Sequence, residues 1–198
     1  MTERSAQPSG LRQRIPTAIA LAVLLVFDLF ALPPIATLLL IALVLLVGAW
    51  EWSAFLQTVR PMRIAYVAMI AFGVLVFDPR ALAPFELDLL LVTSAIWWLA
   101  AFAWIVFAPA KFSPVLTALA GVLALIPTGA ALGYLRLADQ RGAWLVLFVL
   151  VVIMAADVGA YFFGRLFGRV KLAPRVSPGK TWEGVLGGVL LSQLLAAV

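Results

Sequence analysis

The residues whose side chains could do chemistry gather in one stretch of the chain, residues 157–188. This stretch holds five of the fourteen basic residues, together with hydroxyls and two carboxylates, between long apolar runs. A concentration of cations and hydroxyls beside apolar segments is typical of a receptor for anionic groups near a membrane. The five basic residues are Arg165, Arg169, Lys171, Arg175 and Lys180.

The pair Ser177-Pro178 predicts the start of a helix, because serine is a favoured N-cap and proline is favoured at the first helical position. The free N–H groups and the positive dipole end of such a helix bind anions. Lys180 and Thr181 would lie in its first turn, where a lysine is unfavourable unless a phosphate is bound, whereas Glu183 is a type that this turn favours. An alternative is that the loop cations bind anionic lipid headgroups, at about 1 kcal/mol each, in no particular order.

Asp157 lies inside a predicted membrane span, about 9 Å before the end of that span at Phe163. A carboxylate within a span costs about 2.5–3.5 kcal/mol at the centre, so we expect it to face protein or a water-filled cavity. Tyr161 and Gly164 follow on the same helix face. The alternative is that Asp157 pairs with Arg165 or Lys180 and only holds the loop in place.

Composition excludes several classes of protein. The chain of 198 residues is 65% apolar and only 12% charged, whereas soluble domains are about 25% charged. A soluble globular protein, a disordered chain and a nucleic-acid-binding module are therefore excluded. Cysteine and histidine are absent, which removes disulfides, thiol nucleophiles, imidazole-ligated metals and Ser-His-Asp triads. A nucleotide-binding P-loop is also excluded at Gly179-Lys180-Thr181, because Pro174 stands where the first glycine belongs and no strand is predicted before it.

The apolar runs predict an all-α polytopic transmembrane helix bundle with six to seven spans. The organisation we expect is a cytoplasmic N-terminal segment (1–16), a six-span transmembrane region (17–163), and a cytoplasmic phosphate-binding loop followed by the start of a seventh span (164–198). The last apolar run, of about 15 residues, reaches about 22 Å against a core of about 30 Å, so we expect a truncated chain. The predicted spans are 17–32, 35–50, 64–77, 89–107, 115–135, 143–163 and a last one from Trp182.

The distribution of positive charge predicts the orientation of these spans. With the N-terminus in the cytoplasm, eleven of the fourteen basic residues fall on the cytoplasmic side and three on the opposite side. The three are Arg80, Arg136 and Arg141. This places residues 164–181 at the cytoplasmic face.

The motif in residues 157–188 resembles the phosphatidate cytidylyltransferase family, the CDP-diacylglycerol synthases. That family shows Asp-x-Gly-Ala-Tyr-Phe-x-Gly-Arg-x-Phe-Gly, then Lys-Leu-x-Pro-x-x-Ser-Pro-x-Lys-Thr-x-Glu-Gly and a Gly-Gly pair. Here these elements are residues 157–168, 171–184 and 187–188, in the same order. A weaker similarity is Ala49-Trp50-Glu51-Trp52 at the end of the second predicted span.

The resemblance implies transfer of a cytidylyl group from CTP to phosphatidate, giving CDP-diacylglycerol and pyrophosphate, at the cytoplasmic face of a bacterial inner membrane. It implies CTP, phosphatidate and membrane lipid as partners, a possible homodimer, no nucleic acid, and Mg²⁺ as cofactor. The implied phosphate contacts are Ser177, Lys180 and Thr181, with Arg165 and Lys171 as supporting cations. Asp157 and Tyr161 are expected to orient the loop or line the headgroup cavity, and Glu183 is expected to be a further supporting residue.

The chain departs from the family pattern in one respect. Family members carry a C-terminal signature with His-Gly-Gly and aspartates that are the expected metal ligands, and this chain has no histidine. We therefore expect no catalytic residue and no metal ligand set in this chain, and no turnover by it alone. Two other functions are compatible with the sequence. One is a non-catalytic relative that binds anionic lipid or serves as a membrane subunit, and the other is a transporter.

Overall fold

Prolines mark the positions where four of the helices begin. Pro34, Pro61, Pro84 and Pro114 stand at the first or second residue of a helix, where the missing N–H would have no partner within the helix. The structure, a computed structural model, describes residues 11–107 and 113–197, with side chains from residue 16 onward. The elements in this part of the chain are α1 (Leu11–Ala31), α2 (Pro34–Ser53), the 3₁₀ turn η1 (Ala54–Leu56), α3 (Arg60–Val76), α4 (Pro84–Phe107), α5 (Pro114–Leu137), α6 (Gly142–Phe167), β1 (Lys171–Ala173), β2 (Ser177–Thr181) and α7 (Trp182–Ala196).

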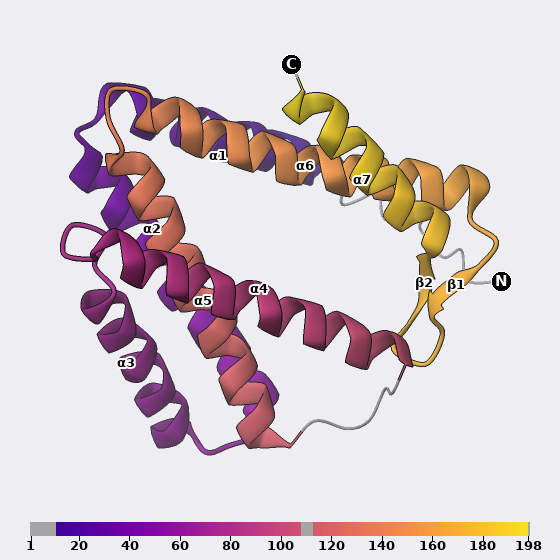
Figure 1. Cartoon of the computed structure of the whole chain (residues 1–198), viewed down its shortest axis with the longest axis horizontal. Coiled ribbons are helices and arrows are strands. Elements are labelled where there is room, and N and C mark those ends of the chain that lie inside the picture. Colours follow the sequence, from indigo (N-terminus) through magenta and orange to yellow (C-terminus); the bar gives the residue numbers. More distant parts are fainter. Residues whose placement is uncertain (1–10, 108–112, 198) are drawn as a thin grey trace, which may run out of the picture.

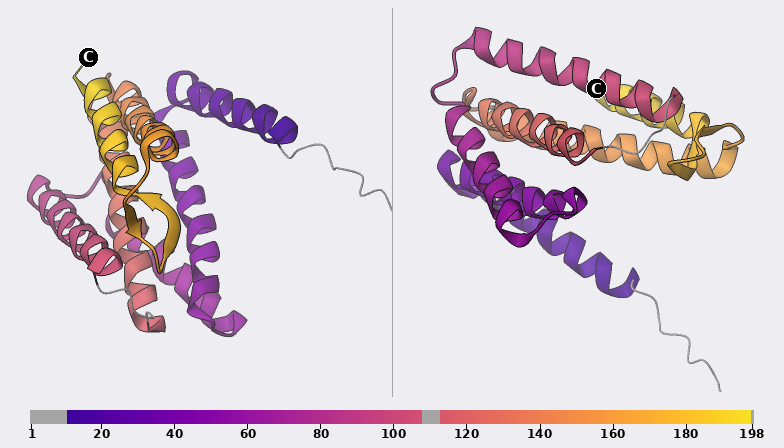
Figure 2. Two further views of the ribbon diagram at one scale, coloured as in Figure 1. Left: turned by 90° about the vertical axis from the view of Figure 1, so that its right-hand side faces the viewer. Right: turned by 90° about the horizontal axis from the view of Figure 1, so that it is seen from below.

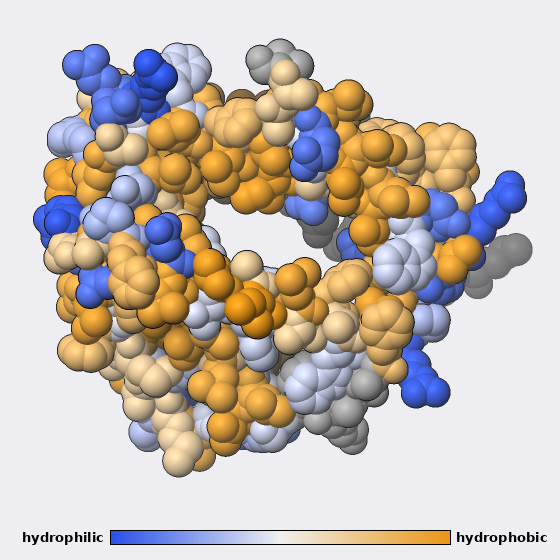
Figure 3. Space-filling view, viewed as in Figure 1, coloured by the Kyte–Doolittle hydropathy of each residue, from blue (hydrophilic) through white to orange (hydrophobic). Residues whose placement is uncertain are grey.

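Each of the seven predicted spans coincides with one helix, so the predicted all-α bundle is confirmed, with a small β-hairpin added. Within residues 11–107 and 113–197, four helices are long and apolar enough to cross a membrane: α2 with η1, α4, α5 and α6. The apolar parts of α1 and α7 are shorter, at Pro16–Ala31 and Trp182–Ala196. The apolar outer surface is visible in Figure 3, as expected for helices whose solvent is lipid.

The helices form two groups that α5 connects. α5 packs against α2, α3 and α4, and it also contacts α6; α4 lies on one side of α5, and α2 and α3 lie on the other (Figures 1 and 2). α6 and α7 run side by side as a closely packed pair. An opening bordered mainly, but not entirely, by apolar side chains lies between this pair and α4 (Figure 3).

A proline inside α5 explains how α4 is attached. Pro127 has no N–H, so the carbonyl of Leu123, four residues earlier, loses its partner within the helix. The Ser94 hydroxyl on α4 donates to that carbonyl at 3.4 Å. On the other side of α5, the Trp52 indole donates to the Thr117 carbonyl at 2.8 Å and the Tyr66 hydroxyl donates to Ala118 at 3.2 Å. Hydrogen bonds to α5 carbonyls therefore hold this helix in place from both sides, and the Leu123 carbonyl is the one that Pro127 leaves without a helical partner.

One of the three basic residues expected on the side opposite the cytoplasm is buried. Arg136 lies in the last turn of α5 and is 7% exposed. Its guanidinium donates to the Thr37 hydroxyl and to the carbonyls of Leu29 and Leu32. Arg136 is therefore part of the packing between α1, α2 and α5, and only Arg80 and Arg141 remain as exposed cations at that end.

Candidate functional site

Glycines let α6 and α7 approach until their backbones touch. A Cβ added at Gly184 would lie 2.9 Å from the Ala160 carbonyl oxygen, and one at Gly188 would lie 2.8 Å from that of Ala156. A Cβ at Gly159 would lie 2.4 Å from the carbonyl oxygen of Gly187. Small residues at such positions are the usual means of close helix packing in lipid. The contact fixes the last turns of α6 against the start of α7.

The segment between α6 and α7 is a hairpin, which corrects the predicted helix start at Ser177. β1 and β2 pair antiparallel, with Lys171 opposite Thr181 and Ala173 opposite Ser177. The N-cap of α7 is Thr181, whose hydroxyl accepts from the Gly184 N–H at 3.2 Å. In a hairpin of two strands, both edges are free, so Pro178 is tolerated in β2. Lys180 and Ser177 consequently lie on the strand that leads to the helix and not in its first turn.

Glu183 joins the hairpin to α7. Its carboxylate accepts from the Val170 N–H, at 3.1 Å to one oxygen and 3.2 Å to the other. The Trp182 N–H donates to the Val170 carbonyl at 3.0 Å. Glu183 therefore contacts the start of the hairpin and does not line the pocket described next. Lys171, predicted as a supporting cation, lies on β1 opposite Thr181 and does not line that pocket either.

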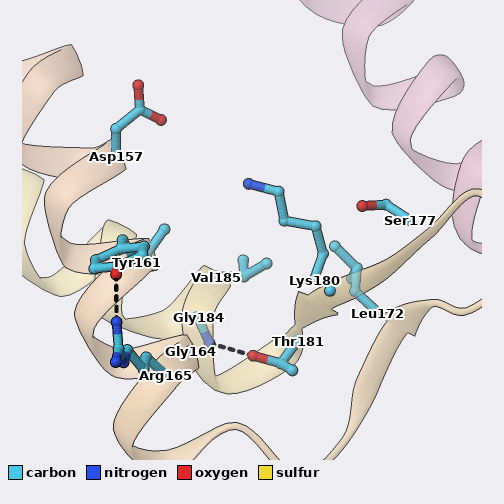
Figure 4. Close-up of a pocket in the computed structure, with 12 residues that line it drawn as sticks. Asp157, Tyr161, Gly164, Arg165, Leu172, Ser177, Lys180, Thr181, Gly184 and Val185 are labelled. Atoms are coloured by element: carbon cyan, nitrogen blue, oxygen red, sulfur yellow. Dashed lines mark hydrogen bonds between the residues drawn. The ribbon is translucent and has the colours of Figure 1, made fainter. Parts of the chain in front are cut away.

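A pocket of about 720 Å³ opens where the end of α6, the hairpin and the start of α7 meet (Figure 4). Six of the eight residues predicted for the site line it, and these are Asp157, Tyr161, Arg165, Ser177, Lys180 and Thr181. Sequence reasoning missed the apolar part of the wall, because nothing in the residue types distinguishes it from ordinary packing. The missed residues include Ala160, Leu172, Gly179 and Val185.

Lys180 and Asp157 face one another across this pocket. The ammonium group of Lys180 extends from β2 toward the carboxylate on α6 (Figure 4). Among the described residues, neither side chain forms an ion pair within 4.0 Å or a hydrogen bond. The alternative in which Asp157 pairs with Arg165 or Lys180 is therefore wrong for this structure. The pocket thus presents a free ammonium and a free carboxylate to whatever it binds.

Arg165 is positioned by its own helix. It lies in the last turn of α6, one turn after Tyr161, and its guanidinium donates to the Tyr161 hydroxyl at 2.7 Å. A cation at a helix C-terminus is favourable, and the hydrogen bond restrains the long side chain. Both residues line the pocket, so Arg165 supplies a second, partly oriented positive charge beside Lys180.

The pocket does not fit a metal held by the protein alone. Within residues 11–107 and 113–197 there is no group of three His, Cys, Asp or Glu side chains that could hold a metal ion. Asp157 is the single carboxylate among the residues that line the pocket. Mg²⁺ is usually bound by one or two carboxylates together with substrate phosphates and water, so the described residues supply at most part of a magnesium site.

The chain matches the model of a family described as the cytidylyltransferase family over residues 12–198. It is 36% identical over 208 residues to a phosphatidate cytidylyltransferase of Haemophilus influenzae, covering 95% of this chain and 72% of that relative. It is 35% identical over 185 residues to a phosphatidate cytidylyltransferase of Pseudomonas aeruginosa, covering 90% of this chain and 66% of that relative. The chain thus spans about two thirds to three quarters of the length of these relatives. No solved structure matches the chain.

Proposed function

This chain belongs to the cytidylyltransferase family, and on that premise we propose that it acts in cytidylyl transfer from CTP to phosphatidate. The products are CDP-diacylglycerol and pyrophosphate. The printed names of the relatives support this activity. The structural observation that carries the proposal is the pocket itself, because it joins an apolar helix pair to a cationic hairpin. A lipid phosphate and a nucleotide phosphate need such a junction in order to meet.

In the proposed reaction, a phosphate oxygen of phosphatidate attacks the α-phosphorus of CTP. The bond between that phosphorus and the oxygen bridging to the β-phosphate breaks, and pyrophosphate leaves with that oxygen. Catalysis of such transfers depends on positioning and on stabilising charge on the phosphoryl oxygens. Lys180, with Ser177 and Thr181, is the proposed contact for these oxygens, and Arg165 adds charge. Asp157 is proposed to line the end of the pocket that holds the lipid headgroup.

Magnesium is proposed as a cofactor that accompanies the nucleotide phosphates. When bound, it would neutralise phosphate charge and stabilise the oxygens around the reacting phosphorus. The described residues do not form a complete site for it, so no step is assigned to the metal. The roles proposed for Lys180, Arg165 and Asp157 concern binding and orientation of the substrates.

The proposal predicts that Lys180→Ala lowers kcat/KM by about 10–100-fold, because a hydrogen bond from a charged group contributes about 1.5–3 kcal/mol. The measurement is turnover of CTP and phosphatidate by the purified protein, which this proposal requires, whereas the missing histidine-containing signature predicts none by this chain alone. Arg175→Ala is the matched control, since it removes the same charge from the same hairpin but from a residue outside the pocket. Equal activity in the two variants would remove Lys180 from the site, and absence of turnover in the unaltered protein would overturn the proposed activity.

We also propose that the hairpin faces the cytoplasm of a bacterial inner membrane, because CTP is cytosolic. The exposed cations of α3, α6 and the hairpin support this orientation through the positive-inside rule. The chain has no cysteine, so single cysteines can be introduced at Arg175 and Arg141 without background. In intact cells, a membrane-impermeant maleimide should label R141C and leave R175C unlabelled until the membrane is opened. The reverse pattern would place the pocket on the wrong side for CTP.

A further inference from the structure

We infer that the end of the bundle opposite the hairpin binds a zwitterionic membrane phospholipid, with an acyl chain in a groove between α2, α3 and α5. This inner groove has a volume of about 140 Å³. Leu38 and Ala42 on α2, Leu75 on α3 and Ala130 on α5 line its apolar walls, and Asp78 and Arg80 stand at its mouth. The site is separate from the pocket at the hairpin and does not depend on the proposed activity.

The length of the inner groove matches one leaflet of a bilayer. Its α2 wall runs from Ile35 to Leu45, a rise of about 15 Å at 1.5 Å per residue. The hydrocarbon core of a bilayer is about 30 Å thick, so the groove reaches from one interface to about the middle. Asp78 and Arg80 lie in the loop between α3 and α4, where a headgroup would be.

Side chains and backbone from α2 and α5 meet at the deep end of the groove. A Cβ at Gly129 on α5 would lie 2.4 Å from Cδ1 of Leu45. The absence of a side chain at Gly129 thus lets Leu45 lie against α5 and form the floor of the groove. An apolar groove between helices that face lipid loses dispersion contacts if it stays empty, and the molecule at hand to fill it is a lipid chain.

A second apolar groove adjoins the first and suits the second chain of the same lipid. This outer groove, between α3 and α4, has a volume of about 360 Å³. Phe77 lines both grooves, so the two meet at the residue that precedes Asp78. Val76 and Leu89 line the outer groove, and Glu86 stands among its lining residues. A single lipid with its headgroup at the α3–α4 loop would thus place one acyl chain in each groove, on either side of Phe77.

Charge at this end selects the headgroup. The Arg80 guanidinium pairs with Asp78, and these hydrogen bonds lower the pKa of the Asp78 carboxyl, so both groups stay charged. Among the described residues, Nη1 of Arg80 has no protein partner, which leaves it free for a phosphate. At this end of the bundle lie the α3–α4 loop, the α5–α6 loop and the first turns of α4. Among the described residues of these segments, acidic side chains outnumber basic ones. The acidic residues are Asp78, Glu86, Asp88 and Asp139, and the basic ones are Arg80 and Arg141.

That excess of negative charge disfavours an anionic headgroup and favours one that carries an ammonium besides its phosphate. The hairpin end has the opposite character, with many exposed cations. The two ends of the bundle therefore differ in the lipid headgroup that they attract. Phosphatidylethanolamine is the simplest probe with the required phosphate and ammonium, and phosphatidylglycerol is the matching anionic probe.

The test uses the protein in nanodiscs of equal parts phosphatidylethanolamine and phosphatidylglycerol, followed by native mass spectrometry of the retained lipid. We expect the unaltered protein to retain phosphatidylethanolamine preferentially. Ala42→Trp fills the inner groove and should lower this retention about tenfold, which corresponds to about 1.4 kcal/mol. Leu43→Trp is the matched control, because Leu43 is the next residue, is 59% exposed and lies outside the groove.

A second variant tests the inference even if Ala42→Trp disturbs folding. Asp78→Asn leaves the groove intact and makes its mouth positive, so retention should shift toward phosphatidylglycerol. Equal retention of phosphatidylethanolamine by Ala42→Trp and Leu43→Trp would show that the inner groove does not bind the lipid. Enrichment of phosphatidylglycerol by the unaltered protein, or no change of preference in Asp78→Asn, would overturn the headgroup assignment.

Discussion

Alanine in place of Gly159 should destabilise the protein by about 2 kcal/mol, although alanine is the better helix former. The added Cβ would lie 2.4 Å from the Gly187 carbonyl oxygen and 2.9 Å from Cβ of Leu191. Neither atom belongs to the flexible end of a side chain, so α6 and α7 must move apart. Overpacking of this kind costs about 1–3 kcal/mol, which exceeds the gain of about 1 kcal/mol in helix propensity.

The same substitution at Gly48 should have the opposite sign. An added Cβ there meets only Cδ2 of Leu125, at 3.6 Å, which is an ordinary van der Waals distance. Gly48→Ala should therefore be neutral or should stabilise α2 by up to about 1 kcal/mol. Thermal unfolding of both variants in one detergent measures the difference. Two shifts of the same sign and size would show that α6 and α7 are not in backbone contact.

Comparing Gly159→Ala with Lys180→Ala distinguishes a variant that displaces the whole pocket from one that removes a single substrate contact. Moving α7 away from α6 displaces Thr181 and Gly184, which line the pocket and begin the helix. Activity should fall together with stability in Gly159→Ala. Lys180 is exposed and forms no hydrogen bond among the described residues, so Lys180→Ala should lower activity at unchanged stability.

Much of this architecture could be predicted because its signals are local. Proline positions and apolar runs indicate the seven helices, since both act through the residues of one helix. The candidate site could also be predicted in large part, because the six predicted residues that line it come from one continuous stretch of 157–181. The spacing of Asp157, Tyr161 and Gly164 on one helix face is likewise a local property, and all three line the pocket.

The hairpin could not be predicted in the same way. Ser177-Pro178 is compatible with a helix start and with a strand in a short hairpin. What decides between them is the pairing with β1 and the hydroxyl of Thr181, which caps α7 at Gly184. A strand pairing depends on residues on both sides of a turn, and no single one of them predicts it.

The contacts of Arg136 are still harder to predict from the sequence, because its partners are distant along the chain. A lone arginine after an apolar run resembles a loop cation. Its side chain instead donates to the carbonyl of Leu29, 107 residues away, and to the hydroxyl of Thr37, 99 residues away. No periodicity or motif carries information about such a contact.

Arg136→Leu should destabilise the protein by about 3 kcal/mol and should release α1 from the bundle. Pro33 has no N–H, so the carbonyl of Leu29, four residues earlier, has no helical partner. Nη2 of Arg136 supplies one at 3.2 Å, and its Nε donates to the Thr37 hydroxyl at 3.0 Å. Each buried polar group left without a partner costs about 1–3 kcal/mol. α1 packs against α2 and α6 over a small area only, so these bonds are a large part of its attachment.

Asp28 provides the second arm of this test. It is 7% exposed, and one of its carboxylate oxygens has no hydrogen-bond partner among the described residues. It directly precedes Leu29, whose carbonyl Arg136 contacts. Although these two described side chains form no ion pair within 4.0 Å, we expect the guanidinium to offset part of the charge of this buried carboxylate. Removing the cation alone leaves the carboxylate uncompensated. Asp28→Asn should therefore destabilise the unaltered protein but recover part of the stability lost in Arg136→Leu.

The matched control for the arginine is Arg141→Leu, which removes the same charge from an exposed residue at the same end. Its effect should stay within about 0.5 kcal/mol. Thermal unfolding gives the stabilities, and limited proteolysis at the loop between α1 and α2 reports release of α1. If Arg136→Leu were as mild as Arg141→Leu, the Leu29 carbonyl would have to find another partner. In that case the end of α1 at Pro33 would not depend on the hydrogen bond from Arg136 on α5. Apolar packing around Leu29 alone would then hold α1 against the bundle.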